Sequence, residues 1–340
     1  MFRKIFTLVV VILFLSAPLL FAEERSSSTD YKIKRLVSEL HDTRRAAPAE
    51  RRLYGYDERA TQYLLPLIKD DTPDNVKIAV LRVMAKIGDA SVEDDIVPLL
   101  RDSNKRIRQQ AAKTLGMFAV KESTIEPLKR LLSDYDAEVR FNAIRTLSKL
   151  ARKDDVEIYV VALGDYDPRV RKFAVNALGE IKDPATVPHL AQMVRDYHPE
   201  VRMELSKTLK QINDETCIEP LLILTRDIDP KVRLFAVKYL CETNLPGTEQ
   251  ALIAVTNNAD PNLASKAIVA LGKTDSEQAL EIAKAHLDDE HLVVKLAAIE
   301  VLGLKGGNDE ISKLRSFETA ESTLVRERAS EALVQAQSRI

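Results

Sequence analysis

The sequence predicts an all-α fold, an α-solenoid of about nine helix-pair repeats of 31 residues each. A Val-Arg type of dipeptide returns along the chain, and its second residue recurs every 31 residues apart from one interval of 32. Self-similarity at a fixed period of this length is typical of stacked repeat architectures. The composition agrees, because Trp is absent, Gly is scarce, and the helix-favouring residues Ala, Leu, Glu and Lys are abundant.

Each repeat carries the apolar pattern of a helix that begins just before this dipeptide. Ala stands three positions after the second residue of the dipeptide in seven repeats, and Leu or Met stands seven positions after it in every repeat. This spacing places the apolar side chains on one face of a helix. The nine dipeptides are Val76-Lys77, Ile107-Arg108, Val139-Arg140, Val170-Arg171, Val201-Arg202, Val232-Arg233, Leu263-Ala264, Val294-Lys295 and Val325-Arg326.

The start of this helix has its own signal. Asp167 is a favourable N-cap, and Pro168 fits the first helical position, where the missing N–H needs no partner. The same Asp-Pro pair recurs at residues 229–230 and 260–261. Four glycines fall late in the helix, near its expected end: Gly116, Gly179, Gly272 and Gly303.

A first helix precedes this one in each repeat, as in residues 217–227, which follow the turn at residues 213–216. One helix pair cannot bury its own apolar face, so the pairs must stack on one another. The small Ala at the repeated contact position lets neighbouring helices approach to about 8–10 Å. We therefore expect the pairs to stack in chain order.

Residues 165–179 read D-x-D-P-x-V-R-x-x-A-x-x-A-L-G, the strongest copy of the pattern. These repeats resemble the HEAT-like repeats of the phycobilisome-lyase type, and the resemblance covers about residues 61–336. Tetratricopeptide repeats fit less well, because their period is about 34 residues and their Trp/Gly/Tyr pattern is missing. The Thr-Pro-Leu-His signature of ankyrin repeats is also absent.

Residues 1–22 have the layout of a secretory signal peptide. Arg3 and Lys4 precede an uncharged apolar run, which ends in Leu-Phe-Ala before Glu23. The alternative is a retained membrane anchor, but a run of 17 residues is at the short end of the spanning range. We expect export to the periplasm or the extracellular space, with no membrane span left after cleavage.

Residues 23–60 lack the repeat pattern. We expect a flexible leader, a capping helix with Ile33, Leu36, Val37 and Leu40 on one face, and a linker. The repeats then fill residues 61–340. Without residues 1–22 the chain has 48 basic and 52 acidic residues, a balance that argues against a nucleic-acid partner.

Charged residues recur with the same period. Asp stands six positions before the basic residue in seven repeats, at Asp71, Asp102, Asp134, Asp165, Asp196, Asp227 and Asp289. In the seventh repeat both members change, to Asn258 and Ala264, as a charge pair predicts. A catalytic residue would occur once rather than in every copy. The resemblance to HEAT-like repeats implies a ladder of such pairs between adjacent repeats, with Asp165 and Arg171 as one rung.

The sequence offers little chemistry beyond this ladder. His286 and His291 flank three acidic residues, but their spacing does not place both on one helical face, so we expect no metal site. The His-Glu dipeptides of HEAT-like deoxyhypusine hydroxylases are absent. We expect no catalytic or cofactor-binding residue, and a HEAT-like enzyme of the lyase type is the alternative. Cys217 and Cys241 could pair if the helix ends meet, or remain two unpaired small residues.

The outer positions of the second helices are the expected binding surface. One column, directly after the basic residue, carries unexpectedly large apolar residues, and another, four positions on, is basic in five of its first six members. The hypothesis is a concave groove for an acidic or amphipathic protein segment. The alternative is that curvature buries the apolar column and the charges are only solvated. The candidate residues are Ile78, Arg82, Lys113, Phe141, Arg145, Lys172, Met203, Lys207, Leu234 and Lys238.

Overall fold

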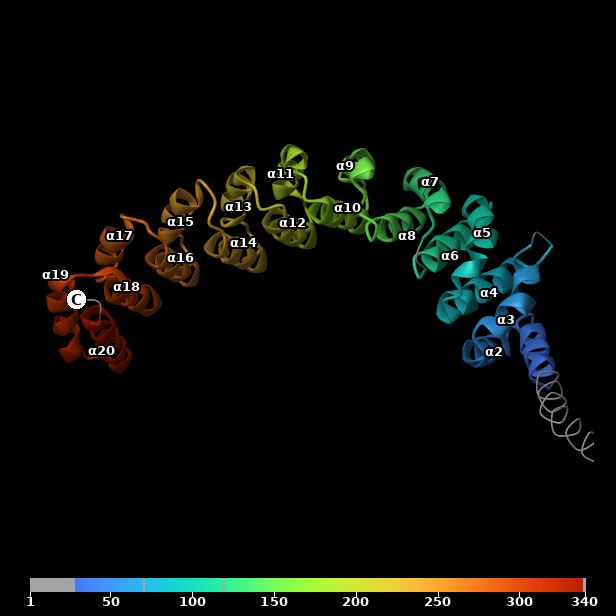
Figure 1. The fold of residues 1–340 in the computed structure, drawn as a ribbon, viewed down its shortest axis with the longest axis horizontal. Helices are drawn as coiled ribbons and strands as arrows, with labels where there is room; N and C mark the ends of the chain where they lie inside the picture. The colour runs from blue at the N-terminus through green and yellow to red at the C-terminus, as the bar shows by residue number, and fades with distance from the viewer. Residues whose placement is uncertain (1–27, 70, 119, 339–340) are drawn as a thin grey trace, which may run out of the picture. The chain divides into compact units, whose positions relative to one another are not determined.

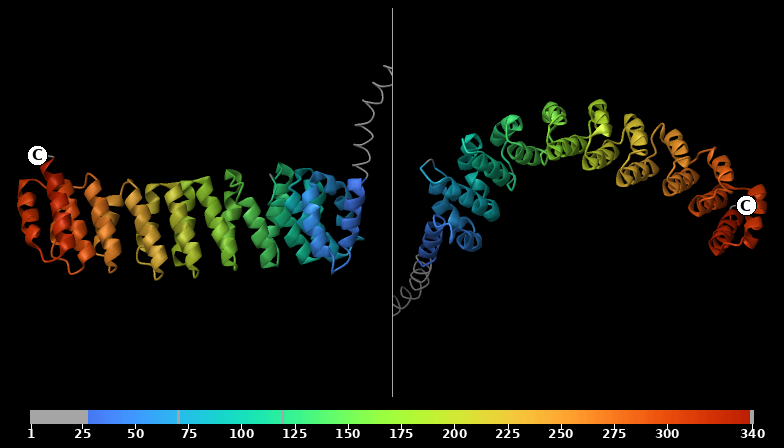
Figure 2. Two further views of the ribbon diagram at one scale, coloured as in Figure 1. Left: turned by 90° about the horizontal axis from the view of Figure 1, so that it is seen from below. Right: turned by 180° about the vertical axis from the view of Figure 1, so that it is seen from behind.

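A computed structural model describes residues 28–69, 71–118 and 120–338, so the expected signal peptide lies outside the described residues. The described residues form α-helices and short 3-10 helices, with no strand among them. They divide into two compact units that meet between Lys149 and Leu150. Within each unit the second helices contact one another in chain order (Figures 1 and 2). The predicted all-α solenoid of helix pairs is therefore confirmed.

The N-terminal unit begins with a helix over residues 28–39. The helices that follow are α2 (Ala46–Leu53), α3 (Glu58–Leu64), α4 (Asp74–Ile87), α5 (Glu93–Ile96), α6 (Lys105–Leu115), α7 (Glu122–Arg130) and α8 (Ala137–Leu147). The second helices of the repeats are α4, α6 and α8. The first helices are shorter, and α3 and α5 pass into 3-10 turns whose opening residues include Pro66 and Pro98. Proline removes a backbone donor, which favours such interruptions.

The C-terminal unit continues the same alternation. Its first helices are α9 (Val156–Ala162), α11 (Val187–Ala191), α13 (Ile218–Leu224), α15 (Thr248–Thr256), α17 (Ala279–Ala285) and α19 (Asn308–Ser316). Its second helices are α10 (Pro168–Ile181), α12 (Pro199–Ile212), α14 (Pro230–Glu242), α16 (Pro261–Lys273), α18 (Leu292–Lys305) and α20 (Thr323–Gln337). The predicted Asp-Pro starts are confirmed, because the carboxylates of Asp167, Asp229 and Asp260 accept N–H groups of the first helical turn.

The repeated apolar columns form the core of both units. The residue three positions after the basic one is fully buried in every repeat: Val80, Ala111, Ala143, Ala174, Leu205, Ala236, Ala267, Ala298 and Ala329. The column seven positions after it is buried as well, from Met84 to Leu333. Burial of apolar surface against the neighbouring pair thus holds each repeat in place.

The late glycines have a packing role. Gly179 and Gly303 lie two residues before the ends of α10 and α18, as expected. A Cβ at Gly303 would lie 2.7 Å from the Cα of Ala332, and one at Gly272 would lie 2.5 Å from a methyl group of Val301. The absence of a side chain therefore lets successive second helices approach closely.

The expected linker is partly wrong, because its residues 46–53 form α2. This helix contacts α4, the second helix of the first repeat. Its residues Ala49, Glu50 and Leu53 are buried. The segment before the repeats therefore supplies one more layer to the stack. None of the helices in the described part of the chain has the length and apolar character needed to cross a membrane.

Candidate partner-binding site

Within each unit, charge pairs of the ladder join a repeat to the following one. Arg171 donates from Nε and Nη2 to the carboxylate of Asp196, at 2.6 and 2.8 Å, and from Nη1 to the backbone oxygen of Asp165, at 2.8 Å. Arg202 binds the carboxylate of Asp227 in the same way, at 2.5 and 2.7 Å. The ladder between repeats is present, but the rung was misassigned. Arg171 binds the carboxylate of Asp196 in the following repeat, and in its own repeat it donates to the backbone carbonyls of Asp165 and Tyr166.

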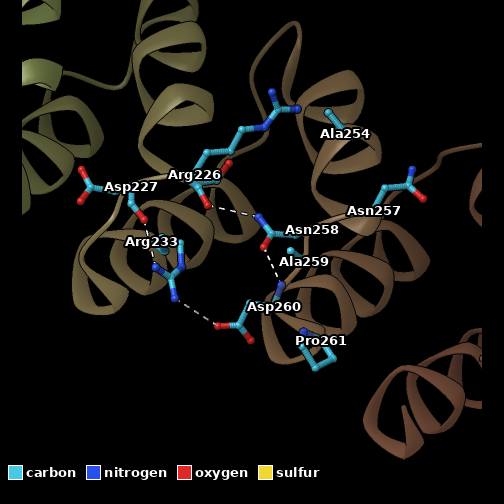
Figure 3. Close-up of a pocket in the computed structure, with 10 residues that line it drawn as sticks. Arg226, Asp227, Arg233, Ala254, Asn257, Asn258, Ala259, Asp260 and Pro261 are labelled. Carbon is cyan, nitrogen blue, oxygen red and sulfur yellow. Dashed lines mark hydrogen bonds and ion pairs between the residues drawn. The ribbon is translucent and has the colours of Figure 1, made fainter. Parts of the chain in front are cut away.

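The ladder changes at Asn258, shown in Figure 3. The Asn258 amide donates to the Thr225 carbonyl at 3.1 Å instead of pairing with Arg233. The Arg233 guanidinium then lies 3.7 Å from Asp260. These residues line a hollow of about 710 Å³. The changes at Asn258 and Ala264 therefore belong to two different rungs and not to a single pair.

The change to Ala264 leaves Asp289 without an arginine from the preceding repeat. His286 and His291 occupy its two carboxylate oxygens instead, each through Nδ1 at 3.2 Å. The backbone N–H of His291 holds the pKa of Asp289 below its ordinary value. No cluster of three or more His, Cys, Asp or Glu side chains suited to a metal ion occurs in the described ranges.

Five of the candidate residues line one hollow in the N-terminal unit. It has a volume of about 540 Å³ and lies over α4, α6 and α8. The five are Ile78, Arg82, Lys113, Phe141 and Arg145, and the hollow adds Arg106, which sequence reasoning missed. The four cations Arg82, Arg106, Lys113 and Arg145, together with the other residues that line this hollow, form the surface called the basic site below.

The cations of the basic site differ in their freedom to bind a partner. Arg82 donates to both carboxylate oxygens of Glu50, at 3.0 and 2.6 Å, so its charge is neutralised within the fold. The guanidinium of Arg145 lies 5.6 Å from the ring centre of Phe141. Within the described ranges, Arg106 and Lys113 are exposed and have no ion-pair partner. Unpaired positive charge is therefore concentrated on α6 and α8.

The candidate residues of the C-terminal unit do not gather in one place. Lys172 forms an ion pair with Glu200 at 3.1 Å, and Lys207 pairs with Glu204 at 3.0 Å. Met203 is half-buried beside them. The positive charges of Lys172 and Lys207 are therefore neutralised here, because acidic residues on the same and the next second helix lie within reach.

Leu234 and Lys238 line a separate hollow over α14, α16 and α18. Sequence reasoning missed Phe235 and Val293 on its wall, although Val269 and Leu296 belong to the columns that it identified. Cys241 also lines this hollow, and both cysteines are free. Burial raises the pKa of the Cys241 thiol to about 11.

Another surface feature escaped the sequence argument. The residue directly after the ladder Asp is almost fully exposed in three successive repeats, although it is large: Tyr166 at 97%, Tyr197 at 94% and Ile228 at 90%. A search of the columns on either side of the ladder position would have found it.

Comparison with known proteins places these surfaces on a familiar scaffold. The sequence profile of HEAT repeats matches residues 61–148, 156–227 and 218–303. No curated protein matches the chain. Among solved structures the chain is similar to an engineered protein, at 20% identity and a TM-score of 0.51, covering 90% of this chain and 99% of that one.

Two further structures are similar over much of the chain. YibA of Escherichia coli has 19% identity and a TM-score of 0.50, covering 75% of this chain and 96% of its own. Kap121p has 14% identity and a TM-score of 0.66, covering 92% of this chain and 42% of its own. At sequence identities this low, the structural similarity shows a shared fold and nothing about function.

Proposed function

Because this chain belongs to the HEAT-repeat family, we propose that it is a non-catalytic scaffold of the cell envelope, which binds a protein partner through the second helices of its repeats. The observation that carries the proposal is the basic site over α4, α6 and α8. Its occupant is an acidic segment of the partner, because carboxylates on that segment would complement the unpaired Arg106 and Lys113.

The composition of the basic site suits an acidic segment that also carries apolar residues. Ile78 and Phe141 supply half-buried apolar surface between the cations. An apolar contact flanked by charges gives both affinity and register at an interface. The ladder, by contrast, is occupied by internal pairs and supports the scaffold.

Residues 1–22 support the envelope location through their signal-peptide layout. When the full-length sequence is expressed in its native cells, we expect the protein in the soluble envelope or culture fraction. Residues 1–22 should have been removed, so that the mature N-terminus lies near Glu23. Fractionation followed by N-terminal sequencing measures both. Recovery in the cytoplasm with Met1 intact would refute export and leave the scaffold proposal standing.

The basic site is tested by the triple variant Arg106→Glu, Lys113→Glu and Arg145→Glu. Arg82 stays unchanged, because its removal would leave the buried Glu50 carboxylate unpaired. The matched control reverses Lys86, Arg101 and Arg130, which are exposed in the same unit and lie outside the hollow.

We expect the triple variant to weaken binding of a fluorescein-labelled acidic peptide by at least about tenfold, since several charge contacts are reversed. Fluorescence anisotropy at low and physiological salt measures this binding. The same variant should lose partner capture from the native envelope by affinity purification and mass spectrometry. Unchanged capture and unchanged peptide binding would refute the basic site.

A further inference from the structure

The second helices of the C-terminal unit carry a hollow of a different chemical character. It has a volume of about 740 Å³ and lies over α14, α16 and α18. Leu234 and Phe235 line it from α14 and are 43% and 36% exposed, and Val293 lines it from α18 and is 40% exposed. Large apolar side chains gathered around one hollow are unusual on a surface that faces only water.

The hollow arises because α16 presents small side chains between two helices that present large ones. Ser265, Val269 and Ala270 line it from α16. Gly272 keeps α16 close to α18, since a Cβ there would lie 2.5 Å from Val301. Because α16 contacts α14 on one side and α18 on the other, the hollow forms a groove with α16 as its floor.

The charges around this groove do not balance. Its lining includes four cations and two carboxylates: Lys238, Lys266, Lys273, Arg328, Glu242 and Glu300. Arg328 holds Glu300 at 2.5 Å, and Glu242 lies 4.0 Å from Lys238 and also pairs with Lys210. Lys266 and Lys273 are exposed on α16 and have no ion-pair partner in the part of the chain that the structure describes.

We propose that this groove binds an amphipathic α-helix of a protein partner. Its apolar face contacts Leu234, Phe235 and Val293, and its flanking Asp or Glu residues pair with Lys266 and Lys273. The two lysines are seven residues apart on α16, which is two helical turns or about 10 Å, so acidic residues at the same spacing on the bound helix would face both. The inference rests on the scaffold function but uses a surface separate from the basic site.

A helix suits this groove better than an extended strand. The groove borders are helices with their backbone groups already paired, so no free edge is present to extend a sheet. Apolar contact along a channel with charges beside it matches the anchoring of a helix through residues at three- and four-residue spacing. The lysines then decide between acidic and basic partners of equal apolar character.

The test uses three labelled peptides of about 18 residues, or five helical turns. One has a Leu stripe flanked by Glu, the second has the same stripe flanked by Lys, and the third has the first composition in scrambled order. We expect the first to bind the full-length protein at least about tenfold more tightly than the other two in fluorescence anisotropy. Equal binding of the scrambled acidic peptide would overturn the proposal.

Two sets of variants locate the binding. Val269→Glu places a charge on the groove floor, and Lys266→Glu with Lys273→Glu reverses the unpaired cations. Each should weaken the first peptide by about tenfold or more. The controls are Val161→Glu, at a 74% exposed valine on α9, and Lys153→Glu with Lys231→Glu, which lie outside the groove. Equal weakening by the controls, or no effect of the groove variants, would overturn the proposal.

Cys241 gives an independent readout. It lines the groove and is only half-buried, whereas Cys217 is 1% exposed. The first peptide should slow the reaction of Cys241 with a thiol reagent, while Cys217 stays unreactive in the folded protein. Unchanged labelling at saturating peptide would overturn the assignment to this groove. The triple variant of the basic site should keep this protection, which separates failure of one site from failure of the other.

Discussion

Gly303 shows how closely the second helices of the C-terminal unit depend on a missing side chain. A Cβ there would lie 2.7 Å from both the Cα and the Cβ of Ala332 on α20. A packed core cannot accept an extra methyl group without displacement of its neighbours. We expect Gly303→Ala to lower the free energy of unfolding by about 1–3 kcal/mol, measured by urea denaturation.

The matched control is Gly164→Ala in the same unit. A Cβ at Gly164 would meet only the carbonyl oxygen of Val161, at an ordinary 3.5 Å. Its free energy of unfolding should stay within about 0.5 kcal/mol of the parent protein. Equal losses in both variants would contradict the close-approach role of Gly303.

Asp136 provides the pH-dependent test at the residue scale. Burial opposes its ionisation, but hydrogen bonds from Lys105, Gln109 and the Val139 N–H outweigh that effect and bring the pKa of Asp136 to about 2. The pKa of Asp in an unfolded chain is about 3.9. The folded state therefore binds the proton less readily, so the stabilisation by Asp136 is complete above the unfolded pKa and is lost as the pH falls through the folded pKa.

We expect Asp136→Asn to lower the Tm at pH 6 and to lower it progressively less between about pH 4 and pH 2. Thermal unfolding followed by circular dichroism across this range measures the difference. Asp95→Asn, at an exposed carboxylate of the same unit, should show no such convergence. A constant Asp136→Asn difference down to pH 2 would contradict the lowered pKa.

At the scale of the elements, α2 is attached to the repeats through Glu50 and Arg82. Glu50 is 7% exposed, and both of its carboxylate oxygens accept hydrogen bonds from Arg82. Removal of Arg82 leaves a buried carboxylate unpaired, whereas removal of Glu50 leaves a half-exposed guanidinium that water can solvate. The two single variants should therefore be unequal.

We expect Arg82→Ala to reduce the free energy of unfolding by about 1–3 kcal/mol, and Glu50→Ala to reduce it by less. In the double variant the loss should be smaller than the sum of the single losses, because the buried charge is gone. A double-mutant cycle by urea denaturation measures the coupling. Strict additivity would show that the pair does not hold α2 on α4.

The elements also show which helices local sequence could specify. All the second helices have the repeated apolar stripe, and several have side-chain N-caps or late glycines. The structure places them where these signals predict. Two of the first helices pass into 3-10 geometry at Pro66 and Pro98, where a backbone donor is missing. Thr114, Thr146 and Thr208 donate buried hydrogen bonds to carbonyls of the preceding second helix, a contact that no local pattern reveals.

At the scale of the whole molecule, the ladder pairs Arg108 with Asp134, Arg171 with Asp196 and Arg202 with Asp227. It changes where Asn258 replaces Asp. Asn258→Asp would give Arg233 the carboxylate that Arg171 and Arg202 already bind. We expect the free energy of unfolding to rise by up to about 1 kcal/mol at neutral pH, the range of a single partly exposed ion pair. Urea denaturation at neutral pH and near pH 3 measures the gain and its loss on protonation.

Asn258→Ala is the companion variant. It removes the bond to the Thr225 carbonyl and the cap on the Asp260 N–H, so it should destabilise the protein at both pH values. A loss of stability in Asn258→Asp equal to that in Asn258→Ala would mean that the Thr225 contact, and not the missing carboxylate, determines this position.

The sequence by itself determined the fold class, the buried columns and the existence of the ladder. The residue pattern behind each of them recurs in nearly every repeat and depends on neighbours at fixed distances along the chain. It also predicted that Ile78, Lys113, Phe141 and Arg145 share one surface, since side chains at equivalent positions of successive second helices lie side by side, and these four residues line one hollow. Only the tertiary structure decided which carboxylate each arginine binds and which cations remain unpaired. Ion pairs between repeats depend on side chains 25 or more residues apart, and one acidic residue on the next helix, such as Glu200 beside Lys172, removes a charge that the sequence pattern alone leaves free.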